Sequence, residues 1–196
     1  MHEILKLILV LTLICGVSAG TLQFARVQLQ DKIEHQNDKY IRGPALSRLF
    51  NTPADQVLQN KINLNLDRQE FPVFYKMENG ELRGLAIEAP GKGGYGGDIH
   101  IMIGINLQTR EFLGLEIIQH SETPGVGSQI EKESFRGQWQ GLPFDQNVQL
   151  QQNNGAIQGI TGATYSSKAV VNGTNTIVDL VLNHSDEIKK LINAKN

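Results

Sequence analysis

The stretch IHIMIGINLQTREFLGLEII, residues 99–118, carries the strongest structural pattern in the chain. Isoleucine occupies every second position from Ile99 to Ile105, which is the period of a strand that buries one face. Apolar residues alternate again from Leu113 onward, after a polar turn at residues 108–110. The stretch therefore predicts two antiparallel strands joined as a hairpin.

Further elements surround this hairpin on both sides. Upstream, residues 71–77 and 82–88 are apolar-rich runs separated by Glu-Asn-Gly-Glu, and an Asn-Gly pair is a strong signal for a tight hairpin turn. Downstream, residues 167–182 and 186–194 show the apolar spacing of helices. These elements predict an α+β domain with a largely antiparallel sheet and helices packed on one face.

The N-terminal part is apolar enough to interact with a membrane. Residues 4–24 are almost uniformly apolar, and at about 1.5 Å per residue they can just cross a hydrocarbon core of about 30 Å. A cleaved signal peptide is the alternative, because Val-Ser-Ala at 17–19 resembles a cleavage site. We expect the anchor to be retained, which divides the chain into a transmembrane anchor (1–27), a helical connector (28–60) and a globular domain (61–196). In either case the domain is expected outside the cytoplasm.

Composition excludes several classes of function. The 196 residues carry a formal net charge of -2, so there is no basic excess to attract nucleic acid. The single cysteine, Cys15, lies in the apolar run, which excludes an intrachain disulfide and a cysteine-based zinc or iron-sulfur cluster held by this chain alone. Any redox chemistry therefore needs an organic cofactor or a partner.

Two segments near the predicted hairpins have unusual composition. The glycine-rich run at 91–97 lacks the Gly-Lys-Ser/Thr of a phosphate-binding Walker loop, and it indicates either a flexible connection or a close backbone approach. The sequence His-Ser-Glu-Thr-Pro-Gly-Val-Gly at 120–127 contains a tight turn that would fix Glu122 and Thr123 at one end of the sheet. A metal site at His120 is disfavoured because no further ligand cluster accompanies it. A plain surface turn remains the alternative.

The third segment is Thr-Gly-Ala-Thr-Tyr-Ser-Ser at 161–167, directly before a predicted helix. Small residues around a hydroxyl allow close approach, and the unpaired N–H groups of a helix start favour a phosphate. The alternative is that Ser166 or Ser167 only caps that helix. Serine hydrolase chemistry is excluded because Gly-x-Ser-x-Gly is absent.

The ordered set of glycine-rich run, isoleucine strand, Glu-Thr-Pro-Gly turn and Thr-Gly-Ala-Thr loop resembles the FMN-binding domain family, over about residues 93–171. Within it, the chain resembles the G subunits of Rnf-type ferredoxin:NAD oxidoreductases, with the C subunits of sodium-pumping NADH:quinone oxidoreductases as near neighbours. The resemblance implies an electron-transfer subunit of an ion-translocating complex, held in the inner membrane by one span, with its domain in the periplasm and other membrane subunits as partners.

The resemblance also implies a site. A separate flavin transferase would join FMN through a phosphoester to Thr164. The resemblance places the rest of the motif and the helix start near the phosphate, and it places the upstream turn near the isoalloxazine ring. The implied residues are Thr161, Gly162, Ala163, Ser167 and Lys168 at the phosphate, and Glu122 and Thr123 at the ring.

One departure from the family pattern motivates a second hypothesis. Gln158 stands where the family usually has an acidic residue before the Thr-Gly-Ala-Thr motif. Under this second hypothesis, the chain is an exported assembly or spacer module without flavin. A third hypothesis keeps the flavin but assigns the chain to another extracytoplasmic reductase.

Overall fold

The computed structural model describes residues 2–66 and 68–195, so the outermost residues of the predicted ranges, 1 and 196, lie outside the described residues. The chain divides into two compact units, and the boundary falls between Tyr40 and Ile41. The second unit therefore begins earlier than the predicted domain at 61–196.

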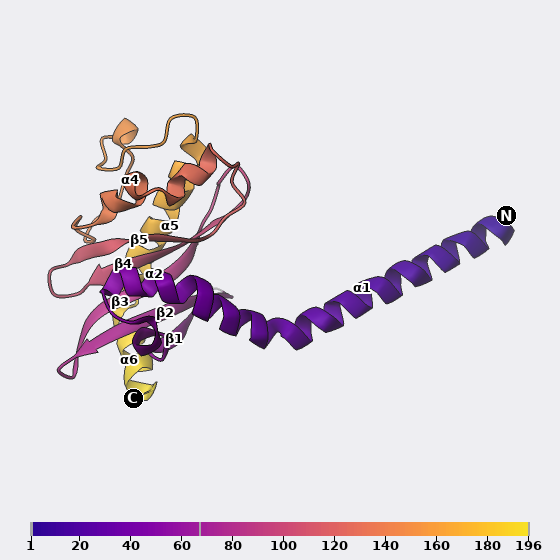
Figure 1. Ribbon diagram of the computed structural model, residues 1–196, viewed down its shortest axis with the longest axis horizontal. Helices are drawn as coiled ribbons and strands as arrows, with labels where there is room; N and C mark the ends of the chain where they lie inside the picture. Colours follow the sequence, from indigo (N-terminus) through magenta and orange to yellow (C-terminus); the bar gives the residue numbers. More distant parts are fainter. Residues whose placement is uncertain (1, 67, 196) are drawn as a thin grey trace. The chain divides into compact units, whose positions relative to one another are not determined.

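The first unit is one long helix, α1 (His2–Asn37), drawn in indigo in Figure 1. Its segment His2–Gln30 has a mean hydropathy of 2.1 and no buried residue in its most apolar window, so by length and composition it is able to cross a membrane. The apolar stretch predicted from the sequence is helical throughout. A π-helix, η1 (Asp38–Arg42), follows α1 across the unit boundary.

The second unit is built on a five-stranded antiparallel sheet in which each strand pairs with its neighbours in sequence (Figure 1). Both predicted hairpins are confirmed as β2–β3 and β4–β5, and Asn79 and Gly80 have the positive φ angles of 53° and 80° that a tight hairpin turn requires. The first strand was not predicted. The strands are β1 (Lys61–Leu66), β2 (Gln69–Glu78), β3 (Glu81–Gly91), β4 (Ile99–Asn106) and β5 (Glu111–Gln119).

One face of the sheet packs against two C-terminal helices, α5 (Thr164–Asn183) and α6 (Ser185–Lys195). The alternating isoleucines of β4 are fully buried in this core, as their spacing predicts. The backbone of α5 lies directly on β3, because a Cβ on Gly91 would come within 2.1 Å of the Ala169 carbonyl oxygen. This close contact fixes α5 on the sheet.

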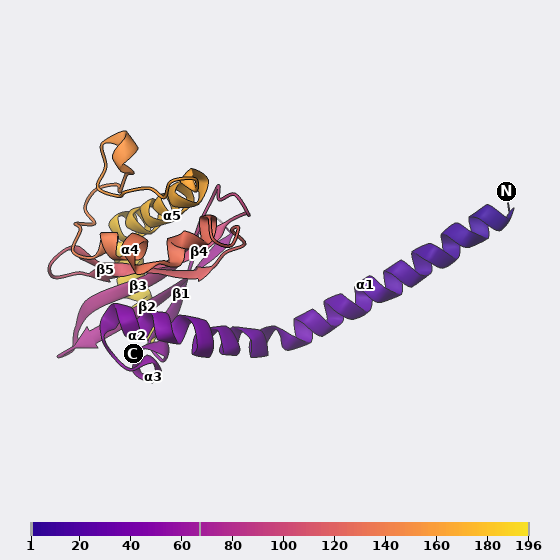
Figure 2. The ribbon, with the colours of Figure 1, turned by 45° about the horizontal axis from the view of Figure 1, so that its top comes forward.

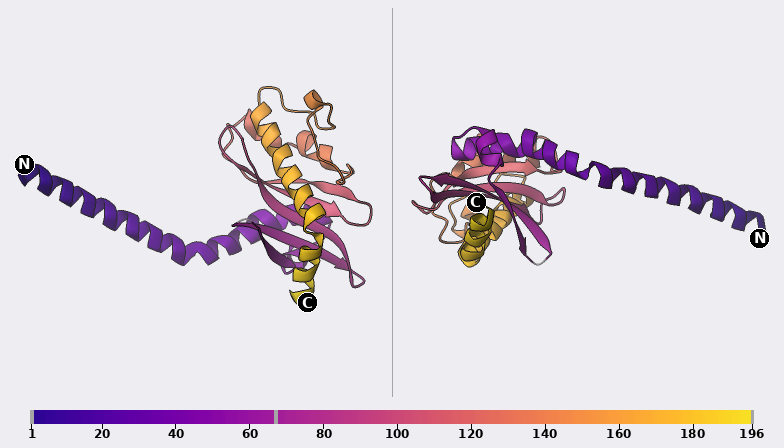
Figure 3. Two further views of the ribbon diagram at one scale, coloured as in Figure 1. Left: turned by 180° about the vertical axis from the view of Figure 1, so that it is seen from behind. Right: turned by 90° about the horizontal axis from the view of Figure 1, so that it is seen from below.

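The other face is covered by α2 (Gly43–Phe50) and α3 (Ala54–Leu58), whose apolar residues pack with Phe74 and Met102 of the sheet. Figures 2 and 3 show α2 and the C-terminal helices on opposite sides of the strands. The α+β class with an antiparallel sheet is confirmed. The expectation of helices on one face holds for α5 and α6, whereas α2 and α3 add a second layer because α2 is amphipathic and buries its apolar stripe.

Short helices connect β5 to α5. Their key residue is Trp139, which is fully buried and donates its indole N–H to Thr174 Oγ1 of α5 at 3.0 Å. This contact ties the connection to the α5 side of the sheet. The elements are η2 (Gly127–Glu131), α4 (Glu133–Arg136), η3 (Gly137–Trp139) and η4 (Gln151–Asn153).

Candidate functional site

The helix α5 begins at Thr164, earlier than the predicted start at residue 167. Ala163 occupies the N-cap position and no side chain caps the helix. The interpretation of Ser166 or Ser167 as the cap is therefore wrong, because both serines lie inside the first turn. Their hydroxyls make other contacts.

Ser167 holds the loop that precedes the helix. Its side chain is fully buried, accepts a hydrogen bond from the Ile160 N–H at 3.0 Å and donates one to the Ala163 carbonyl at 3.0 Å. Gly162, between these two loop residues, has a φ of 80°, a conformation that glycine adopts without strain. The Thr-Gly-Ala-Thr loop is thus held by the helix that it leads into.

Glu122 joins three segments that are distant in sequence. This carboxylate is only 5% exposed, and it accepts a hydrogen bond from Ser166 Oγ at 2.6 Å and from the Gly96 N–H at 3.0 Å. The turn after β5, the glycine-rich loop between β3 and β4, and the start of α5 therefore meet at one buried group.

The neighbouring histidine orients the turn. The Glu122 N–H donates to His120 Nδ1 at 3.0 Å, so the proton of a neutral ring is on Nε2, which lies 3.1 Å from Glu131 Oε1. No group of histidine, cysteine, aspartate or glutamate side chains suited to a metal occurs among residues 2–66 and 68–195. His120 thus serves as a hydrogen-bonding partner of the turn.

Glycine is required where these segments touch. A Cβ on Gly96 would come within 2.0 Å of the Ser121 carbonyl oxygen, and a Cβ on Gly127 within 2.5 Å of Glu122 Oε2. The glycine-rich run is therefore a site of close backbone approach, which distinguishes between the two interpretations that its composition left open.

Two small cavities share Thr164, an exposed residue, in their lining. The first has a volume of about 140 Å³ and lies between Glu122 and the start of α5. The second has about 240 Å³ and is lined by Leu150, Gln152 and the loop from Gly159 to Thr161. The lining of the first is Tyr95, Glu122, Thr123, Val126, Gly127, Gly162, Ala163, Thr164, Tyr165 and Ser166.

The residues predicted from the sequence take different places around these cavities. Thr123, Gly162 and Ala163 line the first cavity with Thr164, while Thr161 lines the second. Lys168 is exposed on α5, one helical turn after Thr164 and on the same side of the helix, and lines neither cavity. Ser167 is buried behind the loop instead of facing a cavity.

The start of α5 suits a bound phosphate. Among the residues that the structure describes, the N–H groups of Thr164, Tyr165 and Ser166 have no hydrogen-bond acceptor. Unpaired N–H groups and the helix dipole both favour an anion at this end of a helix. A phosphate on the Thr164 hydroxyl would lie next to these donors.

Comparison with known proteins identifies the family. Residues 94–179 match the FMN-binding domain, a range that contains most of the glycine-rich loop, the Glu122 turn and the first sixteen residues of α5. The chain is 30% identical over 186 residues to the G subunit of the ion-translocating oxidoreductase complex of Methanosarcina acetivorans, covering 91% of this chain and 95% of the relative. The chain belongs to the G-subunit family.

A second relative and a solved structure are also similar to this chain. The G subunit of the proton-translocating ferredoxin:NAD(+) oxidoreductase complex of Clostridium ljungdahlii is 31% identical over 174 residues, which cover 87% of this chain and 88% of the relative. The crystal structure of the C subunit of the Na(+)-translocating NADH-quinone reductase from Parabacteroides distasonis superposes with a TM-score of 0.58 over 79% of this chain and 94% of that one. At 19% identity, this second likeness shows the shared fold.

The candidate site contains residues that the sequence motifs alone did not assign to it. Ser166 was considered only as a helix cap, yet it binds Glu122, and Tyr95 and Val126 line the cavity beside Thr164. All three lie within or next to the segments that sequence analysis singled out. Their proximity in sequence was the available signal, but only the fold brings the segments together.

Proposed function

We propose that this G-family protein is a membrane-anchored electron-transfer protein that carries FMN as a phosphoester on Thr164, within an ion-translocating oxidoreductase complex. One observation carries the proposal: an exposed threonine hydroxyl lies at the uncapped start of a 20-residue helix, inside the region that matches the FMN-binding domain. The hydroxyl is accessible, and the donors for a phosphate are beside it.

The phosphate would be held mainly by the backbone. The first-turn N–H groups of α5 supply donors and the positive end of the helix dipole. Lys168, one turn further along the exposed side, adds a cation within reach of the same position. Gly162 has open space where a side chain would begin, which leaves room beside the hydroxyl.

The flavin ring would lie on the Glu122 side of Thr164. Tyr95 and Val126 are 78% and 43% exposed where they line that cavity, so they offer apolar surface for a flat ring. A cavity of about 140 Å³ is far smaller than the roughly 300 Å³ or more of a typical site that buries its ligand, so much of the ring would stay exposed. FMN supplies the electron transfer, and an exposed ring suits exchange with a partner protein of the complex.

Attachment needs a flavin transferase that uses flavin adenine dinucleotide. The esterification forms one bond between Thr164 Oγ1 and phosphorus, breaks the phosphoanhydride bond and releases AMP, while the hydroxyl proton passes to a base of the transferase. Helix α1 would anchor the product, and we place the second unit on the periplasmic side of the inner membrane.

Co-expression with a flavin transferase tests the proposal. The full chain, denatured on a gel, should keep flavin fluorescence, whereas Thr164→Ala should lose it and Thr164→Ser should retain it because the hydroxyl remains. Thr109→Ala is the matched control and should keep the fluorescence, since Thr109 is exposed in the β4–β5 turn and lines neither cavity. Fluorescence that persists in denatured Thr164→Ala would overturn the assignment. Unmodified Thr164 in the purified native complex would instead favour a spacer module without flavin.

A further inference from the structure

The side chain of Gln138, in η3, holds the backbone of Gln158. This residue begins the loop, residues 158–163, that leads to Thr164. Gln138 Oε1 accepts a hydrogen bond from the Gln158 N–H at 2.7 Å, and Gln138 Nε2 donates to the Gln158 carbonyl at 3.2 Å. The same Nε2 donates to the Phe135 carbonyl at 3.3 Å. The carboxamide thus binds both backbone polar groups of one residue and is oriented by the helical segment just before it.

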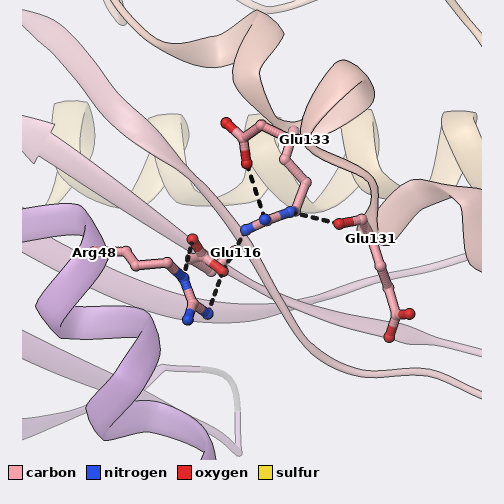
Figure 4. Close-up of polar contacts among 5 residues, drawn as sticks. Arg48, Glu116, Glu131 and Glu133 are labelled. Carbon is pink, nitrogen blue, oxygen red and sulfur yellow. Dashed lines mark hydrogen bonds and ion pairs between the residues drawn. The ribbon is translucent and has the colours of Figure 1, made fainter.

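The segment that carries Gln138 is fixed by an ionic cluster. Glu116 of β5 is buried and accepts hydrogen bonds from Arg48 of α2 at 2.9 and 2.8 Å (Figure 4). Arg136, at the end of α4, also binds Glu116, and it donates to the Glu131 carbonyl at 2.7 Å and to Glu133 at 2.9 Å. The hydrogen bond to Glu116 raises the pKa of Arg48 above its ordinary value. Gln138 therefore extends from a segment that these ionic contacts hold to β5.

The same segment also holds helix α5. Trp139 follows Gln138 directly, and its buried indole N–H binds Thr174 in the middle of α5. Adjacent residues of η3 thus fix the loop at Gln158 and the helix that begins at Thr164. This arrangement sets the distance between the two ends of the loop.

Within the loop, one backbone hydrogen bond, from the Ala163 N–H to the Ile160 carbonyl at 3.0 Å, closes a turn. Gly159 and Gly162 lie within the loop, and glycine has more conformational freedom than any other residue. Ser167 fixes the end near the helix through Ile160 and Ala163. Gln138 holds the other end at Gln158, next to the buried Ile157, whose backbone pairs with Gln149 and Gln151. Both ends must be held for the loop to present Thr164 in one conformation.

We propose that Gln138 is a positioning residue for the modification of Thr164, because its two-point contact with Gln158 keeps the acceptor loop in the shape that a flavin transferase modifies. The inference rests on the proposed function. It also gives Gln158 a role that depends on its backbone and not on its side chain.

The initial rate of flavin attachment to the purified full chain in detergent, with flavin transferase and flavin adenine dinucleotide, tests this. Gln138→Ala loses both contacts with Gln158 and should be modified about tenfold more slowly. Gln140→Ala, an exposed glutamine beside η3, is the matched control and should keep the wild-type rate. Thermal unfolding of each variant is measured in parallel.

Gln138→Glu adds a pH dependence that a purely structural role of Gln138 would not produce. Its ionised carboxylate would face the carbonyl oxygens of Phe135 and Gln158, so at neutral pH it should be slower than Gln138→Ala. As the pH falls toward the ordinary glutamate pKa of about 4.3, the protonated acid is able to donate to Gln158 again. The modification rate of Gln138→Glu, divided by the wild-type rate at the same pH, should then rise. The same ratio for Gln140→Glu should not change with pH.

The outcomes separate the two proposals. Wild-type protein that takes up no flavin overturns the proposed function and this inference with it. If the wild type is modified but Gln138→Ala reaches the same rate, only the inference fails. It also fails if the rates merely follow the unfolding temperatures and Gln138→Glu shows no recovery in acid.

Discussion

Thr164 and Glu122 border the same cavity, but they differ in exposure and in hydrogen bonding. Thr164 is exposed, and its hydroxyl makes no hydrogen bond with the described chain, whereas Glu122 is 5% exposed and binds two other segments. The contrast indicates that the two motifs have separate tasks. One presents a group for modification, and the other holds together the surface on which the modification lies.

The largest effect that would test this separation is on flavin content. Thr164→Ala should lose all covalent flavin, because the acceptor oxygen is gone. Its free energy of unfolding without flavin should change by no more than about 0.5 kcal/mol, because an exposed side chain without partners contributes little. Chemical denaturation of the flavin-free proteins measures this, and a large loss of stability would contradict the separation.

The next effect is on the stability of the second unit. Glu122→Ala leaves the buried Ser166 hydroxyl without its acceptor and removes the part-buried contact of the Gly96 N–H, so the free energy of unfolding should fall by about 2 to 3 kcal/mol. Glu122→Gln keeps one acceptor oxygen and should lose about 1 kcal/mol. Denaturant unfolding of the flavin-free chain compares them, and equal stability of wild type and Glu122→Ala would show that the carboxylate does not hold the segments.

A smaller effect is expected at the partner of Glu122. Ser166→Ala removes one hydrogen bond at 2.6 Å but leaves the Gly96 contact, so it should cost about 1 kcal/mol. The double variant with Glu122→Ala should lose less than the sum of both single variants, because the two residues share one contact. A double-mutant cycle measures the coupling, and strict additivity would contradict a direct interaction.

Glu88 extends the comparison to a buried carboxylate with charged partners. Arg42 Nε lies 2.6 Å from Glu88 Oε2, and His100 Nδ1 lies 3.6 Å from Oε1. Burial alone would raise the pKa of Glu88, but the nearby His100 ring and the hydrogen bond from Arg42 hold it below its ordinary value. The carboxylate of Glu88 in turn raises the pKa of His100 above its ordinary value of 6.5.

The smallest predicted effect is a pH dependence that belongs to this pair. Because the folded state raises the His100 pKa, its stabilising contribution is complete below about pH 6.5 and is lost as the pH rises past the raised value. In His100→Gln, the free energy of unfolding should vary less across that pH window than in the wild type. The difference should be about 0.5 kcal/mol or less, because solvent screens the half-exposed ring. Unfolding across pH checks this, and an unchanged profile in the variant would contradict the coupling.

The parts of the fold with strict periodicity were predictable from the sequence, as the isoleucines of β4 and the Asn79-Gly80 turn demonstrate. Strand β1 was missed although Ile62 and Leu64 alternate, because the segment is short and polar at its other positions. Helix α5 was predicted to start too late, since Ser167 was interpreted as a possible cap, whereas the helix begins after Ala163 with no side-chain cap. Local patterns indicate elements but not which polar groups lie unpaired.

The candidate site was predictable in its parts and not in its assembly. Thr164 and Glu122 were named from their motifs, whereas the contact between Glu122 and Ser166 joins residues 44 positions apart. The contact of Gln138 with Gln158 is made to backbone atoms, so no side-chain pattern in the sequence announces it. Such contacts depend on how α5 packs on the sheet that contains β5.

Peptide mapping by tandem mass spectrometry is the sharpest test of covalent flavin on Thr164. The full chain is purified from cells that contain a flavin transferase, digested, and searched for the peptide that contains Thr164. We predict that this peptide gains the mass of one FMN less one water, with the fragment ions locating the addition on Thr164. An unmodified Thr164 peptide alongside flavin attached to another residue, or no attached flavin at all, would contradict the proposal.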